Sequence, residues 1–196
     1  MARRVYIVPA EAIASGPGAG GRTPAYLGRN NAGATSGYRC MDYGLEPVFL
    51  CVAEVSAAQH AAIAANAPIT VVPADLSGNV GGQRANVEAA LESWNIPGTW
   101  VTSGMSYREV LRGVATIFQV AQRLHGLYGV RAFPPGITLG TTMAELTQAQ
   151  RNALAAVNDS FGWDRSQVTG ATTLRQWLRG AAQQWQGAVL LGGEAL

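Results

Sequence analysis

A strand, a helix and a second strand follow one another early in the chain, and this order limits the fold more than any other feature. Residues 46–55, EPVFLCVAEV, form a nearly continuous apolar run, which is typical of a strand covered on both faces. Residues 56–66 are rich in alanine and predict a helix that Pro68 ends. Residues 69–76, ITVVPADL, predict a second strand. We therefore expect a β-α-β unit whose two strands run parallel and are joined by a right-handed crossover.

The N-terminal part adds one more strand and a long polar segment. Residues 3–10, RRVYIVPA, predict a strand because β-branched and aromatic residues follow one another in a short run. With the β-α-β unit, this strand indicates a small, ferredoxin-like sheet. Residues 12–39 are rich in Gly, Ala, Ser and Asn, which predicts a long loop or an extended arm. We assign residues 1–78 to an α/β sheet domain that carries this glycine-rich arm.

The rest of the chain predicts helices. Apolar residues recur with helical spacing in four segments, which are 78–95, 107–125, 147–162 and 172–186. Ser106, Thr147 and Thr173 are each followed three residues later by Glu or Gln, which is the spacing of a capping box. The chain ends with GAVLLGGEAL, an apolar segment bounded by glycine. We expect an α+β fold in which residues 79–196 form a helical region with an apolar tail, and we expect no internal repeat.

The segment SYREVLRGVATIFQVAQRL, residues 106–124, is the most regular of these helices. Its apolar side chains fall on one face, namely Val110, Val114, Ile117, Phe118, Ala121 and Leu124. Its arginines lie largely away from that face. We interpret this segment as the central scaffold helix of the helical region.

The basic residues exclude several classes of enzyme. All 14 basic residues are arginine, and the formal net charge is +2. A Walker A phosphate loop, a Schiff-base enzyme and a protein kinase each require a lysine, so none of them fits this chain.

Catalytic, cofactor and metal motifs are also missing from the sequence. His60 and His125 belong to no HExxH motif, and Cys40 and Cys51 stand eleven apart without a CxxC pair. The GPGAGG run at 16–21 is not followed by a helix, as a dinucleotide-binding loop would be. We therefore expect no catalytic residues, no cofactor and no metal, and we expect a protein that is not an enzyme.

The surface chemistry favours association with other proteins. Charged residues make up only 13% of the chain, about half of what a typical domain carries. Low charge favours self-association. We expect the interface to use aromatic and apolar residues of the connectors together with the arm and the tail; the candidates are Gly18, Gly20, Tyr26, Trp100, Phe133, Trp163, Leu190 and Leu191. No signal peptide and no run of about 20 apolar residues is present, so we expect neither secretion nor a transmembrane segment.

The order of the segments resembles that of small proteins encoded among the virion genes of tailed bacteriophages. The resemblance is carried by MDYGLEPVFLCVAEVSAAQHAAIAAN, by VVPADL and by ALESWNIPGTWVTSGMSYREVLRGVATIFQVAQRL, and it covers roughly residues 38–185. It implies a structural subunit of the capsid, neck or tail that acts by oligomeric assembly. Its implied partners are other copies of itself and other virion proteins, and its implied location is the virion, after assembly in the host cytoplasm. It carries over no functional residues.

Two other functions remain open from the residues. A small-molecule-binding domain or an enzyme could be built on the β-α-β unit. A DNA-binding regulator could use Arg175 and Arg179 on the last helix, although specific nucleic-acid binding needs a stripe of positive charge that a net charge of +2 does not supply.

Overall fold

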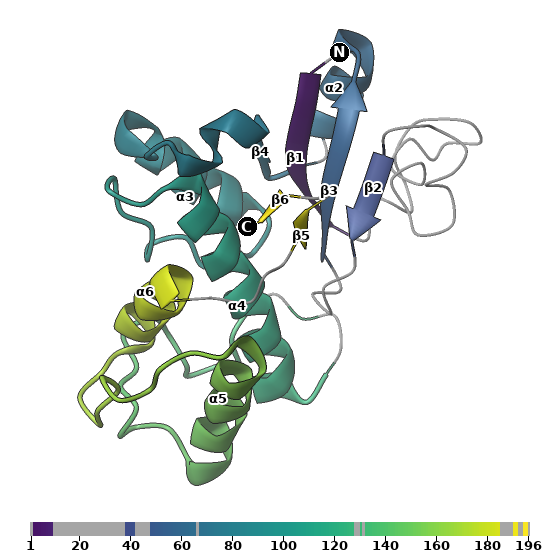
Figure 1. Ribbon diagram of the computed structural model, residues 1–196. Coiled ribbons are helices and arrows are strands. Elements are labelled where there is room, and N and C mark those ends of the chain that lie inside the picture. Colours follow the sequence, from purple (N-terminus) through teal and green to yellow (C-terminus); the bar gives the residue numbers. More distant parts are fainter. Residues whose placement is uncertain are drawn as a thin grey trace. The chain divides into compact units, whose positions relative to one another are not determined.

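The protein has a mixed α and β structure, as predicted. The computed structural model describes residues 2–9, 38–41, 48–65, 67–127, 130, 132–184, 190–191 and 194–195 (Figure 1). The chain divides into two compact units, one of Met1–Gly78 with Val189–Leu196 and the other of Asn79–Ala188. The tail at 189–196, which the sequence analysis placed with the helical region, groups with the sheet unit because its strand β5, Leu190–Leu191, lies against the sheet strand β3.

The sheet unit contains a four-stranded antiparallel sheet in the order β2-β3-β1-β4. The strands are β1 (Ala2–Pro9), β2 (Tyr38–Met41), β3 (Val48–Val55) and β4 (Ile69–Val71). The central strand β1 is paired on both sides, and its side chains Val5, Tyr6 and Ile7 are buried. A second, two-stranded sheet pairs β5 with β6 (Glu194–Ala195).

The predicted strand, helix and strand of the β-α-β unit are present, but the two strands are not neighbours in the sheet. Helix α2 (Ala57–Ala64) connects β3 to β4. Both strands pair antiparallel with β1, so they run in the same direction, but β1 lies between them. The predicted strand at 69–76 is too long, because Pro73 begins a 3-10 helix, η2 (Pro73–Ser77). Strand β2 is not among the predicted strands, because its first two residues, Tyr38 and Arg39, belong to the predicted arm at 12–39.

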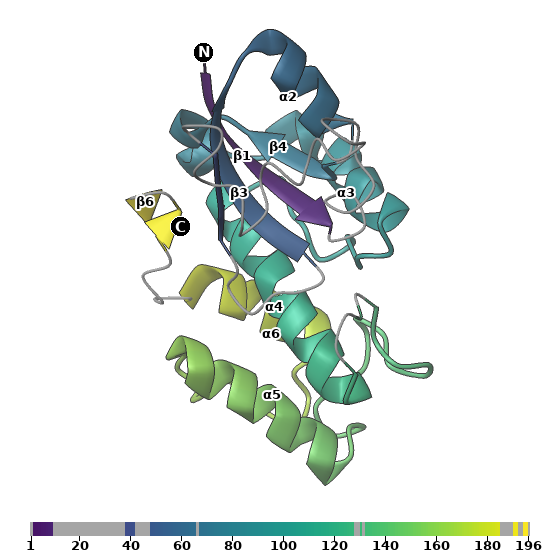
Figure 2. The same ribbon diagram turned by 90° about the vertical axis from the view of Figure 1, so that its right-hand side faces the viewer.

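The helical unit begins with a 3-10 turn, η3 (Gly81–Gln83), followed by helix α3 (Arg84–Ser93). The next three helices are α4 (Tyr107–His125), α5 (Gln148–Phe161) and α6 (Leu174–Gln184). The predicted capping boxes are confirmed at Ser106, Thr147 and Thr173, where the side chain accepts from the backbone N–H three residues on and the backbone N–H donates to the Glu or Gln side chain. Figure 2 shows α5 and α6 beside α4, and α4 packs against both.

Helix α4 is the central helix of this unit, as predicted, but its burial extends beyond one face. The predicted stripe is buried from Val110 to Ala121, whereas Leu124 is half-buried. Leu111, Ala115 and Val120 are buried as well.

The helical unit contains an internal repeat that the sequence analysis did not expect. Residues 101–115, VTSGMSYREVLRGVA, match residues 168–182, VTGATTLRQWLRGAA, in the Val-Thr pair, the cap position and the Leu-Arg-Gly run. The match is structural too, because each segment contains a loop followed by a capped helix. We call residues 79–117 the first half and residues 142–184 the second half.

The two halves share one backbone hydrogen-bond pattern. Four backbone hydrogen bonds of the first half each have a counterpart in the second. In the first half they are Val80 N to Met105 O, Gly81 N to Ser103 O, Ile96 N to Leu91 O and Val101 N to Gly98 O. Their counterparts, in the same order, are Met143 N to Thr172 O, Ala144 N to Gly170 O, Trp163 N to Asn158 O and Val168 N to Arg165 O. The N-cap residues also form equivalent bridges, Ser106 with Asn79 and Thr173 with Thr142. The first helix of each half ends before a residue in the left-handed region, Asn95 at a φ of 58° and Gly162 at a φ of 70°. The halves therefore have the same architecture, although α5 is longer than α3.

Candidate binding cleft

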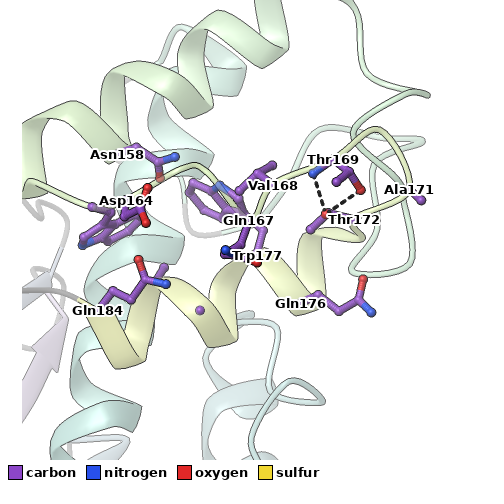
Figure 3. A pocket seen from close by; sticks show the side chains of 13 residues that line it. Asn158, Asp164, Gln167, Val168, Thr169, Ala171, Thr172, Gln176, Trp177 and Gln184 are labelled. Carbon is purple, nitrogen blue, oxygen red and sulfur yellow. Dashed lines mark hydrogen bonds between the residues drawn. The ribbon is translucent and has the colours of Figure 1, made fainter.

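A cleft of about 380 Å³ opens in the second half, between the end of α5, the loop after it and α6 (Figure 3). Its lining residues come from all three elements; they are Asn158, Trp163, Asp164, Gln167, Val168, Thr169, Ala171, Thr172, Gln176, Trp177, Gly180, Ala181 and Gln184. Two further clefts, of about 610 Å³ and 640 Å³, lie in the same unit. The cleft in Figure 3 differs from them because Gly180, part of the repeated Leu-Arg-Gly run, belongs to its lining.

Two tryptophans form an apolar wall of this cleft. Trp163 follows the helix-ending Gly162, and Trp177 lies in the first turn of α6. Their rings meet edge to face, with a centroid distance of 5.4 Å and an interplanar angle of 69°, which is a favourable geometry for aromatic pairs. Both side chains are buried, so the wall is preformed.

Gly180 provides an open patch of helix surface in the cleft. A Cβ atom built on Gly180 meets no heavy atom of the described residues within 4 Å. The equivalent residue of the first half is Gly113, where such an atom would lie 2.2 Å from Cη2 of Trp100. The indole of Trp100 therefore covers Gly113 directly, whereas none of the residues that the structure describes covers Gly180 in this way.

The polar lining of the cleft consists mainly of neutral amides. Gln167 and Gln176 are exposed, and Gln184 is half-buried. Asp164 contributes a carboxylate, whose oxygens accept from Ser166 N at 2.8 Å and from Ser166 Oγ at 2.7 Å. These two hydrogen bonds, the backbone one first, lower the pKa of Asp164. The cleft thus combines aromatic surface with amide donors and acceptors and one ionised carboxylate.

The structure places the predicted interface residues very differently from one another. Trp163 lines the cleft, and Phe133 is half-buried in the wall of the cleft of about 640 Å³. Leu190 and Leu191 form β5, and Gly18, Gly20 and Tyr26 lie outside the described residues.

The prediction for Trp100 as an interface residue is wrong for the folded chain. Trp100 is fully buried, and its Nε1 donates to Pro97 O at 2.7 Å. The physical reason is Gly113, whose missing side chain lets the indole reach the surface of α4.

The two arginines considered for DNA binding make contacts within the helical unit. Arg179 Nε donates to Trp100 O at 2.7 Å, and Arg175 Nη2 donates to Thr99 Oγ1 at 3.4 Å. Burial, followed by the charges of Arg175 and Arg84, lowers the pKa of Arg179. These contacts connect α6 to the loop of the first half.

One polar pair stands out on the sheet unit. Tyr6 Oη and His60 Nδ1 are 3.1 Å apart, and their ring centroids are separated by 6.0 Å. Burial, followed by the charge of Arg4, lowers the pKa of His60. Across the described residues, no group of three His, Cys, Asp or Glu side chains is arranged to hold a metal ion, and no described helix is long and apolar enough to span a membrane.

Comparison of the chain with family models, with curated proteins and with solved structures gives no match in any of the three. The cleft also escaped the sequence analysis, although its signal was present. The alignment of 101–115 with 168–182 can be extended by one residue, which pairs Trp100 with Gln167. The presence of an indole at one of these equivalent positions and an amide at the other marks the site.

Proposed function

We propose that this protein is a structural subunit of a tailed-phage virion, in the capsid, neck or tail, and that it acts by associating with other proteins of the particle. The resemblance described above supplies the class of particle. The chemistry of the cleft supports association, because aromatic side chains are enriched where proteins meet.

The single observation that carries this proposal is the difference between the two halves. The first half covers its glycine with its own indole, and the second half leaves the equivalent glycine open beside two tryptophans. An open, preformed aromatic cleft on a rigid capped helix suits the docking of a neighbouring chain.

The test is to look for the chain in the particle. We expect mass spectrometry of purified particles produced from the genome that encodes this chain to detect it in a fixed copy number. We also expect light scattering of the isolated full chain to show self-association or, after mixing with disrupted particles, a larger complex. A strictly monomeric chain that is missing from purified particles would refute the proposal.

A second candidate function is ligand binding on the sheet unit, and the Tyr6–His60 pair favours it. A histidine of lowered pKa that meets a phenol resembles a general-base arrangement. The unit itself fits a ferredoxin-like arrangement in so far as β3 and β4 flank β1, and we propose that topology as its finer description. A Tyr6→Phe variant that loses binding to a partner or small molecule, with an unchanged melting temperature, would support this candidate over the first.

A third candidate, a DNA-binding regulator, draws no support from α6. Arg175 and Arg179 both donate hydrogen bonds to the loop of the first half. Titration with duplex DNA at low and high salt tests this alternative directly, because phosphate contacts produce a steep salt dependence.

A further inference from the structure

We infer that the cleft beside Gly180 is a binding site for an indole ring, namely the tryptophan side chain of a partner protein. The assignment of the ring to a partner protein rests on the proposed function. The assignment of the cleft as an indole site rests on the first half of the helical unit, which serves as a template.

The template is the site that holds the Trp100 ring between Gly113 and Pro97 O, which we call the seat of Trp100. Its indole lies against the backbone of α4 at Gly113, so closely that a Cβ atom there would overlap the ring at 2.2 Å. The ring nitrogen donates to Pro97 O at 2.7 Å, three residues earlier in the same loop. A helix glycine and a nearby carbonyl thus form a seat in which the six-membered ring of an indole lies directly against the helix.

The second half repeats this seat without the ring. Gln167 stands where the first half has Trp100, and Gly180 stands where it has Gly113. The loop backbone is the same, since Val168 N donates to Arg165 O as Val101 N donates to Gly98 O. The helix glycine is retained and open, the equivalent carbonyl is that of Asp164, and the space beside them is the cleft of about 380 Å³.

The side chains around the seat differ between the two halves, and those of the second half favour an aromatic ligand. Ile96 and Val110 of the first half correspond to Trp163 and Trp177 of the second. Both tryptophans line the cleft, and they leave the surface of Gly180 uncovered. An entering ring would therefore meet aromatic side chains at positions where the first half has aliphatic ones, and aromatic pairs contribute beyond their buried area.

The charges of the cleft select a peptide over a free metabolite. Among the residues that the structure describes, the lining includes no arginine and no histidine, and Asp164 carries a carboxylate of lowered pKa. The carboxylate of a free tryptophan would meet no cation and would be repelled by Asp164. A tryptophan within a chain has neutral amides on both sides. Gln167 and Gln184 can pair with these as donors and acceptors, and Gln176 can donate from Nε2 while its Oε1 accepts from Thr173.

The first test titrates the full-length chain with N-acetyl-tryptophanamide and follows the indole Nε1–H signals of Trp163 and Trp177 by NMR. We expect saturable binding with a Kd of about 1 mM, as suits one small ring. Binding of free tryptophan and of N-acetyl-phenylalaninamide should be at least about fivefold weaker, because the first brings a repelled carboxylate and the second lacks the N–H donor. Equal binding of free tryptophan would overturn the protein origin of the ligand, and no binding of any probe would overturn the site.

The matched variants for this titration lie on one helix. Gly180→Leu places a side chain in the seat, and we expect it to weaken binding of N-acetyl-tryptophanamide by about tenfold or more. Gln183→Leu adds the same side chain at an exposed position of α6 that does not line the cleft, and binding should be unchanged. A Gly180→Leu variant that is folded and binds normally contradicts the inference.

The second test restores the missing ring. Gln167→Trp gives the second half the residue that the first half has, and we expect the new indole to cover Gly180. The melting temperature should then rise by about 3 °C or more, and binding of N-acetyl-tryptophanamide should be lost. Gln183→Trp, the control, should change neither. A Gln167→Trp chain that melts lower and still binds the probe counts against the seat, and if it does not fold, the Gly180→Leu result decides.

These results separate the inference from the proposed function. If the chain is found in particles but binds no indole, the proposed function stands and the indole site is refuted. If the chain binds indole but is missing from particles, the indole site stands and the phage proposal is refuted.

Discussion

The two halves of the helical unit share a backbone and differ in how it is closed. In both halves, a loop is followed by a capping residue that forms a β-bridge with an earlier residue, and then by a helix. Each helix has a glycine seven residues after its cap. In the first half that glycine is covered by Trp100, and in the second it borders an open cleft. Caps and turns therefore define this backbone, while one loop side chain decides whether the glycine of each half is covered or open.

Removing the covering ring should have the largest effect. We expect Trp100→Ala to destabilise the protein by about 3–5 kcal/mol, because it empties a fully buried seat. Gln167→Ala, its counterpart in the second half, should lie within about 0.5 kcal/mol of the parent, since Gln167 is exposed. Urea unfolding of both variants measures this contrast, and equal losses would remove the distinction between closed and open halves.

The two glycines should respond in opposite directions to the same substitution. Gly113→Ala forces the Trp100 ring away and should cost about 1–3 kcal/mol. Gly180→Ala meets no atom of the described part of the chain within 4 Å and should stabilise the protein by about 0.5–1 kcal/mol, because alanine favours the helix. Thermal unfolding decides the signs, and a loss at Gly180 equal to that at Gly113 would mean that the second seat is occupied in solution.

The caps should behave alike in the two halves. Ser106 and Thr173 each accept a hydrogen bond from the backbone N–H three residues later, at 3.2 Å in both cases. We expect Ser106→Ala and Thr173→Ala each to cost about 1 kcal/mol in urea unfolding. A difference of more than about 1 kcal/mol between them would show that one helix depends far less on its cap than the shared pattern implies.

The smallest contrast concerns acid. The pKa of Asp164 is lowered by its hydrogen bonds from Ser166, so these bonds stabilise the loop at pH values above the usual value of about 4 and are lost as the pH falls through the lowered pKa. The equivalent residue of the first half is Pro97, which does not titrate. We expect the exchange protection factor of the Ser166 amide to fall below about pH 4, while that of the Val101 amide, which donates to the Gly98 carbonyl, stays constant. An Asp164→Asn variant with the same acid response would assign the effect elsewhere.

Much of the helical unit could be predicted from local chemistry. The capping boxes located the starts of α4, α5 and α6, since a Ser or Thr with Glu or Gln three residues on satisfies free backbone donors within the segment itself. The strands were harder, because pairing is not local. Strand β2 has four residues and exists by pairing with β3, and Pro73 shortened β4 by starting a 3-10 turn.

The candidate site could not be predicted, for two physical reasons. The repeat is inconspicuous because its spacing is constant only from the last turn of α3 and α5 onward, and the longer α5 changes the spacing before that point. Trp100 lies on a connector, and an aromatic residue on a connector is expected at the surface. Its burial depends on Gly113, which lies on the following helix and shows its importance only when the loop folds back onto it.

The packing of α4 on α6 has a consequence for symmetry. It brings the same element of each half together, as an isologous contact does in a homodimer. In a homodimer, every substitution occurs twice, so both seats would gain or lose their ring together. Within one polypeptide the two positions vary independently, and Trp100 and Gln167 show the result, an indole in one half and an amide at the equivalent position of the other.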